Sequence, residues 1–271
     1  METYRLKNIV IVILLILNFF LLFLVASRYY TKHQSEQELI HQTVTLLQSN
    51  QISIDPALLD TEEHLFTYFN ERNSHDELVF ASTLLGTINT QHDNGGGSYL
   101  YKNQSGSITF RSNGAFELDV YTPSLYVSDY EDFIRDYCPR NYRFSKITEE
   151  DTHVIVKATP YIKGLPIYNA SIDFVFKDHY LISASGFFVP SSIENQSSVS
   201  GSLTEKCSAV IAWMDYCIKE GRISNSVDAI SSGYFLQSTT SFPLLLSPVY
   251  KIDTNTYSYY VNAANGHIYI A

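Results

Sequence analysis

The feature that constrains this chain most is an apolar run close to its N-terminus. Residues Ile9–Ala26 read IVIVILLILNFFLLFLVA, interrupted by a single polar residue, Asn18. A helix of roughly 17–25 apolar residues crosses the hydrocarbon core of a bilayer. Charged and aromatic residues suited to the two interfaces flank the run, namely Arg5, Lys7, Arg28, Tyr29, Tyr30 and Lys32. We therefore expect a transmembrane helix over residues 9–27, behind a cytoplasmic tail of residues 1–8.

The orientation and processing of this segment depend on weaker signals. The basic residues on its two sides are too evenly balanced to fix its direction. We expect a cytoplasmic N-terminus and an extracytoplasmic bulk, because long domains translocate with little regard to charge. A cleaved signal peptide is the alternative, since Val25-Ala26-Ser27 offers a small-residue cleavage site. The run exceeds the roughly 7–15 residues of a signal core, which favours an uncleaved, single-pass anchor in the cell membrane.

The remainder of the chain has the composition of a folded, β-rich protein. Of the 271 residues of the whole chain 45% are hydrophobic, with 21 Tyr and 16 Phe, and aromatic rings suit strands. A formal net charge of -10 argues against binding nucleic acid. Cys207 and Cys217 would lie about 15 Å apart on one helix, too far to bridge. A bridge from Cys138 to either stays open, although three free, packed thiols are favoured.

Helical patterns follow the apolar run. Leu39, Ile40, Val44 and Leu47 recur at helical spacing and predict a juxtamembrane helical stalk over residues 28–50. Asp55-Pro56 then breaks the helix. Three Ser-x-x-Glu capping signatures predict further helices, beginning at Ser74 and Glu77, Ser128 and Glu131, and Ser202 and Glu205. Their stop signals are Gly86, Pro139 and Gly221.

Short strands are predicted after each of these three helices. The expected ranges are 99–101, 107–111, 115–121, 153–160, 167–176, 181–189, 227–236, 248–252, 257–262 and 267–270. Asn113-Gly114 and Asn265-Gly266 are expected to be two-residue hairpin turns. Alternation along the strands places Ile172, Phe174 and Phe176 on one face of a sheet and Tyr257, Tyr259 and Val261 on one face of another.

Two stretches of the chain share one design, because Pro166 and Pro248 each open a Pro-[Ile/Val]-Tyr segment followed by alternating apolar residues. Both prolines are expected at strand starts, where a missing N–H is tolerated. We predict an α+β fold in which a single transmembrane helix precedes repeated units of a helix and an antiparallel meander. The expected domains are an N-terminal α+β domain (51–125), a middle unit (126–190), a linker (191–202) and a C-terminal unit (203–271).

Motifs of known chemistry are missing from the sequence. It contains no nucleophile elbow, H-E-x-x-H motif or phosphate loop, and its eight histidines are scattered. Gly95–Gly97 is expected to be a turn, and Glu149-Glu150-Asp151 a solvated hairpin tip. Asp129, Glu131 and Asp132 suit the positive end of a helix. We expect no catalytic, cofactor-binding or metal-binding residue, and a protein that is not an enzyme.

The layout resembles a known family. A short basic tail runs into LKNIVIVILLILNFFLLFLV, and two later segments read GLPIYNASIDFVF and SPVYKIDTNTYSYYVNAANGHIYI. This resembles the YycI/YycH family of Gram-positive two-component-system regulators, and the closing unit is similar to a PepSY domain. The resemblance implies an extracytoplasmic regulator that contacts a membrane sensor histidine kinase of cell-wall metabolism and restrains it. The candidate interaction residues are Asn18, Phe19, Phe20 and Phe23, although Asn18 fits no family pattern.

The resemblance implies partners but no cofactor. The expected partners are the kinase, the lipid bilayer, and a related regulator or a second copy of this chain. One alternative is a PepSY-type inhibitor or chaperone of an extracellular peptidase, acting by strand addition at the edges of Pro166–Val189 or Pro248–Ile270. A third hypothesis is a wall-modifying enzyme, which would need two carboxyl groups roughly 5–10 Å apart in a cleft.

Overall fold

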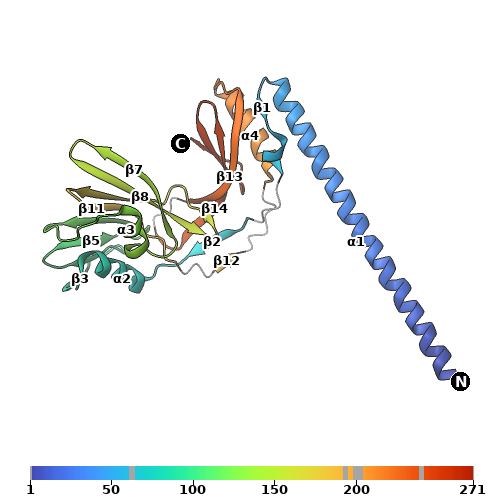
Figure 1. Ribbon diagram of the computed structural model, residues 1–271, viewed down its shortest axis with the longest axis horizontal. Coiled ribbons are helices and arrows are strands. Elements are labelled where there is room, and N and C mark those ends of the chain that lie inside the picture. The colour runs from blue at the N-terminus through green and yellow to red at the C-terminus, as the bar shows by residue number, and fades with distance from the viewer. Residues whose placement is uncertain (1, 61–64, 192–194, 198–203, 238–240, 271) are drawn as a thin grey trace.

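A computed structural model describes residues 2–60, 65–191, 195–197, 204–237 and 241–270. The described chain is a mixed α+β protein with one long N-terminal helix and two mainly antiparallel sheets. The helix projects from the two sheets as a rod (Figure 1). The predicted fold class is confirmed at this level.

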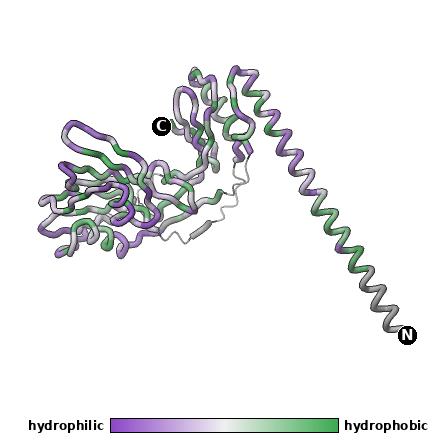
Figure 2. The backbone as a smooth tube through the Cα atoms, viewed as in Figure 1, coloured by the Kyte–Doolittle hydropathy of each residue, from purple (hydrophilic) through white to green (hydrophobic). Residues whose placement is uncertain are grey.

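Helix α1, Glu2–Ser49, joins the predicted membrane segment and the predicted stalk without interruption. Its 48 residues make it about 72 Å long. It is the one described helix that is long and apolar enough to cross a membrane. Figure 2 shows the apolar residues gathered on the half that leaves the body. The helix ends where Gln51 takes a φ of 62° and the Ile52 N–H donates to the Leu47 carbonyl at 3.0 Å.

Pro56 begins a new element instead of ending α1. It opens a short 3-10 helix, Pro56–Leu59, in which its missing N–H costs nothing. The Asp55 carboxylate caps this helix by accepting from the Ala57 N–H at 3.0 Å.

The larger of the two sheets has nine strands in the order β3-β4-β5-β6-β11-β10-β8-β7, with β9 paired to β8. Their bounds are β3 Thr90–Asp93, β4 Tyr99–Lys102, β5 Gly106–Phe110, β6 Ala115–Val120, β7 Tyr142–Glu150, β8 His153–Ile162, β9 Leu165–Pro166, β10 Ile172–Lys177 and β11 Tyr180–Phe187. Two meanders meet where β6 pairs with β11. The predicted boundary between the N-terminal domain and the middle unit therefore falls between neighbouring strands of one sheet.

Helices α2, Ser74–Leu85, and α3, Tyr130–Tyr137, supply the apolar side chains that cover the large sheet. The Phe80 ring lies 5.4 Å from that of Phe116, and the Phe133 ring 5.1 Å from that of Phe174, both edge-on. Ile172, Phe174 and Phe176 are each fully buried, so the predicted alternation of β10 is confirmed.

The smaller sheet has seven strands. Their bounds are β1 Ser53–Ile54, β2 Thr67–Asn70, β12 Asn195–Ser197, β13 Ser226–Leu236, β14 Leu244–Thr254, β15 Ser258–Asn262 and β16 Ile268–Ile270. The order β1-β13-β14-β15-β16 forms its main path, and β2 pairs with β12 and β14. The predicted linker thus contains a strand. Each of the helices α2, α3 and α4, Lys206–Lys219, precedes a four-strand meander, namely β3 to β6, β7-β8-β10-β11 and β13 to β16.

The small sheet and α4 enclose a second core. Trp213 on α4 and Tyr259 on β15 are both fully buried, with their ring centroids 5.9 Å apart. Val261 is buried beside them, as expected. Tyr257 was predicted on the same face but is 53% exposed, because β15 begins only at Ser258.

A close backbone approach joins the two sheets. A Cβ added to Gly233 on β13 would lie 2.3 Å from the Tyr168 ring and 2.8 Å from the Pro166 carbonyl oxygen. The Tyr168 N–H donates to the Tyr234 carbonyl at 2.9 Å. The Asn169 side chain bonds both the N–H and the carbonyl of Leu236, at 2.7 and 2.8 Å. The segment after β9 thus extends the edge of β13.

A buried ion pair supports the same junction. The Arg72 guanidinium donates to both carboxylate oxygens of Glu77, at 2.8 and 3.0 Å, and Glu77 is only 2% exposed. Burial raises the pKa of Glu77, and Arg72 opposes that shift. The guanidinium also lies over the rings of Tyr99 and Phe242, 4.6 and 5.8 Å from their centroids. It therefore links α2, β4 and the segment before β14.

Tyr168 gives the junction a predicted pH dependence. Burial is the main cause that raises the pKa of Tyr168 to about 12, and its hydroxyl lies 3.0 Å from Ser231 Oγ. The native state holds this proton more tightly than the unfolded chain does. Its contribution to stability is therefore complete below pH 10 and is lost as the pH rises from 10 to about 12.

Tyr168→Phe should cost about 1 kcal/mol at neutral pH through the lost hydrogen bond. Between pH 10 and about 12, the urea midpoint of Tyr168→Phe should also fall less steeply with pH than that of the unchanged protein. Urea titrations of both proteins across the range, followed by circular dichroism, measure this. An unchanged slope would contradict the assignment of the proton.

Helices α2 and α3 begin within one residue of the predicted starts, although their caps differ from the predicted serines, whereas α4 begins later than predicted, at Lys206. The α2 cap is Asn73, whose Oδ1 accepts from the N–H groups of His75 and Asp76, and not Ser74. The α3 cap is Asp129, one residue after the predicted Ser128. In both cases the Oδ1 of an Asx side chain accepts from the first free N–H groups of the helix. Glu205 precedes α4, while Ser202 lies outside the described residues.

The stop signals fare better than the caps. Gly86 and Gly221 adopt φ of 80° and 65° after α2 and α4, and Pro139 follows the end of α3. The two Asn-Gly turns differ from the prediction, because Gly114 and Gly266 have positive φ whereas their asparagines do not. The turn at Asn113-Gly114 is a three-residue loop, closed by the Arg111 N–H, which donates to the Ala115 carbonyl at 2.8 Å.

The strand predictions are wrong for strands with mostly polar residues and for the position of one proline. Strands β3 and β7 were missed because their exposed residues give no apolar alternation. Glu149 and Glu150 end β7 next to the hairpin turn, as expected. Pro166 lies in β9, but Pro248 lies inside β14 and not at its start. The Pro248 carbonyl accepts from the Ala263 N–H at 2.9 Å. Pro248 lies where the neighbour of β14 on that side changes from β2 to β15. Its missing N–H therefore breaks no described hydrogen bond of the sheet.

Candidate interaction surface

The predicted contact residues lie on the projecting half of α1, where side chains from Ile13 to Tyr30 are exposed. Phe19, Phe20 and Phe23 are 73%, 56% and 63% exposed. Together with Leu15 and Ile16 they line a shallow apolar recess along one face of the helix. The structure therefore brings the three predicted phenylalanines together.

Asn18 points elsewhere. At about 100° per residue, its direction differs by roughly 150° from the mean direction of the three phenylalanines. A partner helix on the phenylalanine face would leave the Asn18 amide on the opposite side. The four predicted residues thus make two surfaces, one aromatic and one with a single polar group that a second helix could bond.

The upper end of α1 is packed and not a free stalk. Leu47 is fully buried in the core formed by α4 and the small sheet, and Leu39, Ile40 and Val44 pack against that core. Thr43 is 1% exposed, and its hydroxyl donates to the Leu39 carbonyl at 2.8 Å. The predicted apolar stripe is therefore confirmed, but it serves to fuse the helix with the C-terminal body.

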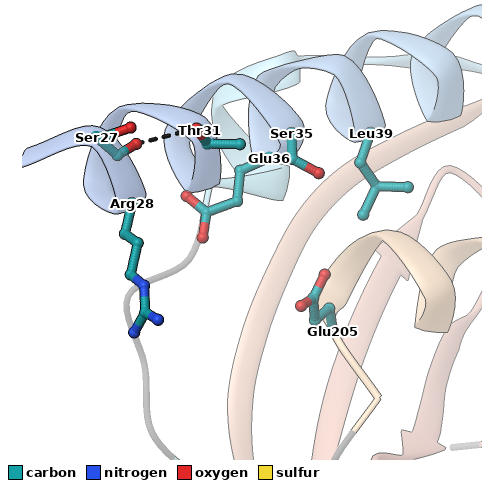
Figure 3. Close-up of a pocket in the computed structure, with 7 residues that line it drawn as sticks. All are labelled: Ser27, Arg28, Thr31, Ser35, Glu36, Leu39 and Glu205. Atoms are coloured by element: carbon teal, nitrogen blue, oxygen red, sulfur yellow. Dashed lines mark hydrogen bonds between the residues drawn. The ribbon is translucent and has the colours of Figure 1, made fainter. Parts of the chain in front are cut away.

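A pocket lies just below this docked region, between α1 and the start of α4 (Figure 3). Its volume is about 450 Å³, and it is lined by Ser27, Arg28, Thr31, Ser35, Glu36, Leu39 and Glu205. The Thr31 hydroxyl donates to the Ser27 carbonyl at 2.9 Å. We call this the juxtamembrane pocket. Its described lining combines the Arg28 guanidinium with the Glu36 and Glu205 carboxylates and the apolar side chain of Leu39.

Glu205 has an unusual place in this pocket. It occupies the cap position of α4 but makes no side-chain hydrogen bond to the helix it precedes. Figure 3 shows its carboxylate directed toward α1. The sequence pattern predicts Glu205 as a capping residue and Arg28 as a membrane flank. Nothing local could have paired two residues so far apart in the chain.

The described residues include no group of three or more His, Cys, Asp or Glu side chains that could hold a metal ion. Cys138, Cys207 and Cys217 are buried and unbridged. Burial raises the pKa of all three thiols. They remain protonated at neutral pH and pack as small apolar groups, as the sequence favoured.

Free strand edges are fewer than the peptidase hypothesis expected. Strands β10 and β11 lie inside the large sheet, and β14 lies inside the small one. Of the two stretches proposed for strand addition, Pro248–Ile270 contains the strand that ends the main path of a described sheet, which is β16. Among the described strands β16 pairs with β15 alone.

No family model matches this chain, and no curated protein is similar to it in sequence. An uncharacterized protein from Eubacterium rectale, solved by crystallography, has 13% identity and a TM-score of 0.41, over 80% of this chain and 90% of its own. The C-terminal domain of YpeB from Bacillus megaterium has 10% identity and a TM-score of 0.39, over 74% of this chain and 98% of its own. Similarities of this degree carry no information on which residues function.

Proposed function

We propose that this protein is a membrane-anchored, extracytoplasmic regulator of a sensor histidine kinase, acting by protein–protein contact. One observation carries the proposal most directly: α1 is continuous from its apolar half into the core of the C-terminal body. Leu47 and Thr43 are buried there, so the helix and the C-terminal body pack as one unit. A packed rod can pass a displacement of the outer body to a neighbouring membrane helix.

The contacts proposed for this role are on both parts of the molecule. The phenylalanine face of α1 would meet an apolar helix of the kinase, because side-chain packing drives association of helices in lipid. The two sheets would meet its outer segment, and a related regulator or a second copy could occupy the Asn18 face. The N-terminus would be cytoplasmic and the sheets outside the cell membrane.

The finer assignment rests on the sequence resemblance. We propose that the chain is a YycI/YycH-like regulator of a cell-wall-linked two-component system, and that its helix and meander units are PepSY-like repeats. The succession of three helices, each followed by a four-strand meander, supports the second part. The cell-wall link follows from the same resemblance.

Exchanging the apolar segment tests the proposal. Replacing Ile9–Ala26 with a polyleucine–alanine helix of equal length should keep the chain in the membrane and remove most kinase association. The reason is that the exchange deletes the Phe19, Phe20 and Phe23 surface. Co-purification from detergent and kinase autophosphorylation in proteoliposomes measure the two effects.

The control and the contrary outcome concern the two faces of α1. Replacing only Leu14 and Leu22, on the Asn18 side, with alanine should leave kinase binding within about twofold if the phenylalanine face makes the contact. Full association and unchanged kinase output after the complete exchange would reject a membrane contact.

The peptidase hypothesis keeps one favourable observation, the edge of β16. Extracellular peptidases mixed with residues 28–271 would be inhibited without the anchor if that hypothesis holds. Ile268→Pro would then remove the inhibition, since proline cannot donate to an added strand. The wall-modifying hypothesis has only the pair Glu36 and Glu205, which share their pocket with Arg28.

A further inference from the structure

The juxtamembrane pocket lies where a bilayer surface would meet the protein. The apolar run ends at Ala26, so Arg28 and Thr31 lie about 3 and 8 Å farther along the helix axis. The polar layer on each side of a bilayer is roughly 5–8 Å thick. The membrane-facing end of the pocket therefore opens within the headgroup layer, and its Glu205 end lies farther out.

The charges in the pocket select among headgroups. The Arg28 guanidinium is a planar fork that matches phosphate oxygens. The Glu36 and Glu205 carboxylates disfavour a headgroup that carries only negative charge. The same Arg28 disfavours a purely cationic ligand, such as a lysine side chain of a partner protein. A ligand that suits both ends has a phosphate near the bilayer and a cation above it.

Glu205 indicates which cation fits. Its carboxylate is not used by its own helix and is directed into the pocket. A primary ammonium offers three N–H donors to such an acceptor, whereas a quaternary ammonium offers none. Ser35, which also lines the pocket, adds a hydroxyl that can accept from the same group.

We propose that the juxtamembrane pocket binds a phosphoethanolamine lipid headgroup, with its phosphate on Arg28 and its ammonium on Glu205. This inference depends on the membrane anchoring of the proposed function, but not on the kinase. Bound headgroups would hold the body of the protein at a set height and rotation above the bilayer. The pocket would thereby make α1 sensitive to the lipid composition of its leaflet.

The test uses the full-length chain in nanodiscs that hold phosphatidylglycerol mixed equally with phosphatidylethanolamine or with phosphatidylcholine. Lipids retained by the protein after gentle release are counted by native mass spectrometry. Phosphatidylethanolamine should be enriched over both other lipids. Arg28→Gln and Glu205→Gln should each weaken its retention about tenfold or more, the effect of losing a hydrogen bond to a charged group.

Glu38→Gln is the matched control, because Glu38 is exposed on α1 outside the pocket lining. It should leave lipid retention unchanged. Circular dichroism checks that Glu205→Gln keeps its helices, which is expected since Glu205 makes no cap bond. Equal retention of the three lipids, or wild-type retention by Glu205→Gln, would overturn the headgroup site.

Flotation on a sucrose gradient separates this test from that of the proposed function. A chain that fails to float with the lipid is not anchored, and both proposals fall. A chain that floats but shows no headgroup preference refutes the headgroup site alone. Loss of the kinase contact leaves the nanodisc result unaffected, because no kinase is present in it.

Discussion

Trp213→Ala is expected to lower the free energy of unfolding of the C-terminal body by about 3–5 kcal/mol. The Trp213 side chain is fully buried between α1, α4 and the small sheet, and it packs edge-on against Tyr259. Removing it opens a cavity at the point where all three elements meet. Urea denaturation of the full chain in detergent, followed by far-ultraviolet circular dichroism, measures the shift.

Ile218→Ala supplies the matched control for Trp213. Ile218 lies on the same helix but is 58% exposed, so its truncation should change stability by no more than about 0.5 kcal/mol. Comparable losses in the two variants would mean that α4 does not face the sheet as described. Helix propensity cannot produce the difference, because alanine is the best helix former in both positions.

Leu47→Ala should have the second large effect, a loss of about 2–5 kcal/mol. Leu47 is fully buried where α1 enters the second core, whereas its neighbour Leu46 is 39% exposed. Leu46→Ala should therefore be nearly neutral. Trp213 is the single tryptophan of the chain, so its fluorescence during urea unfolding reports on this core directly.

The Leu47 pair also separates stability from signal transfer. If the packed helix carries the regulatory displacement, Leu47→Ala should reduce the effect on the kinase under conditions where the chain is still folded and still bound. Leu46→Ala should retain the full effect. Equal regulation by both variants, with Leu47→Ala measurably loosened, would mean that α1 acts only as a tether.

Local patterns in the sequence were sufficient for the identity of most elements. The apolar run and the stripe from Leu39 to Leu47 predicted α1, because helical periodicity needs no knowledge of distant residues. Gly86 and Gly221 predicted helix ends, since glycine alone takes positive φ at little cost. The caps were displaced, because Ser-x-x-Glu is common and competes with neighbouring Asx residues such as Asn73 and Asp129.

Contacts between distant segments were not predictable in the same way. Three such contacts depend on surfaces that form only after the elements have packed. They are the pairing of β6 with β11, the packing of Tyr168 against Gly233, and the packing of α1 against α4. Strand β7 was invisible for a related reason, since the neighbouring strand and not its own apolar pattern holds it in place.

Of the two candidate surfaces, one depends on local sequence and the other on contacts between distant segments. That Phe19, Phe20 and Phe23 share one face could be inferred from the sequence, because the helical period alone sets which side chains lie together. The juxtamembrane pocket could not, because it exists only when the first turn of α4 lies against α1. The order of residues thus decided the hydrophobic periods, the helix ends and the long apolar helix, because these depend on neighbouring residues alone. Tertiary structure alone decided which charges share a pocket, because packing places Arg28 and Glu205 in one lining across most of the chain.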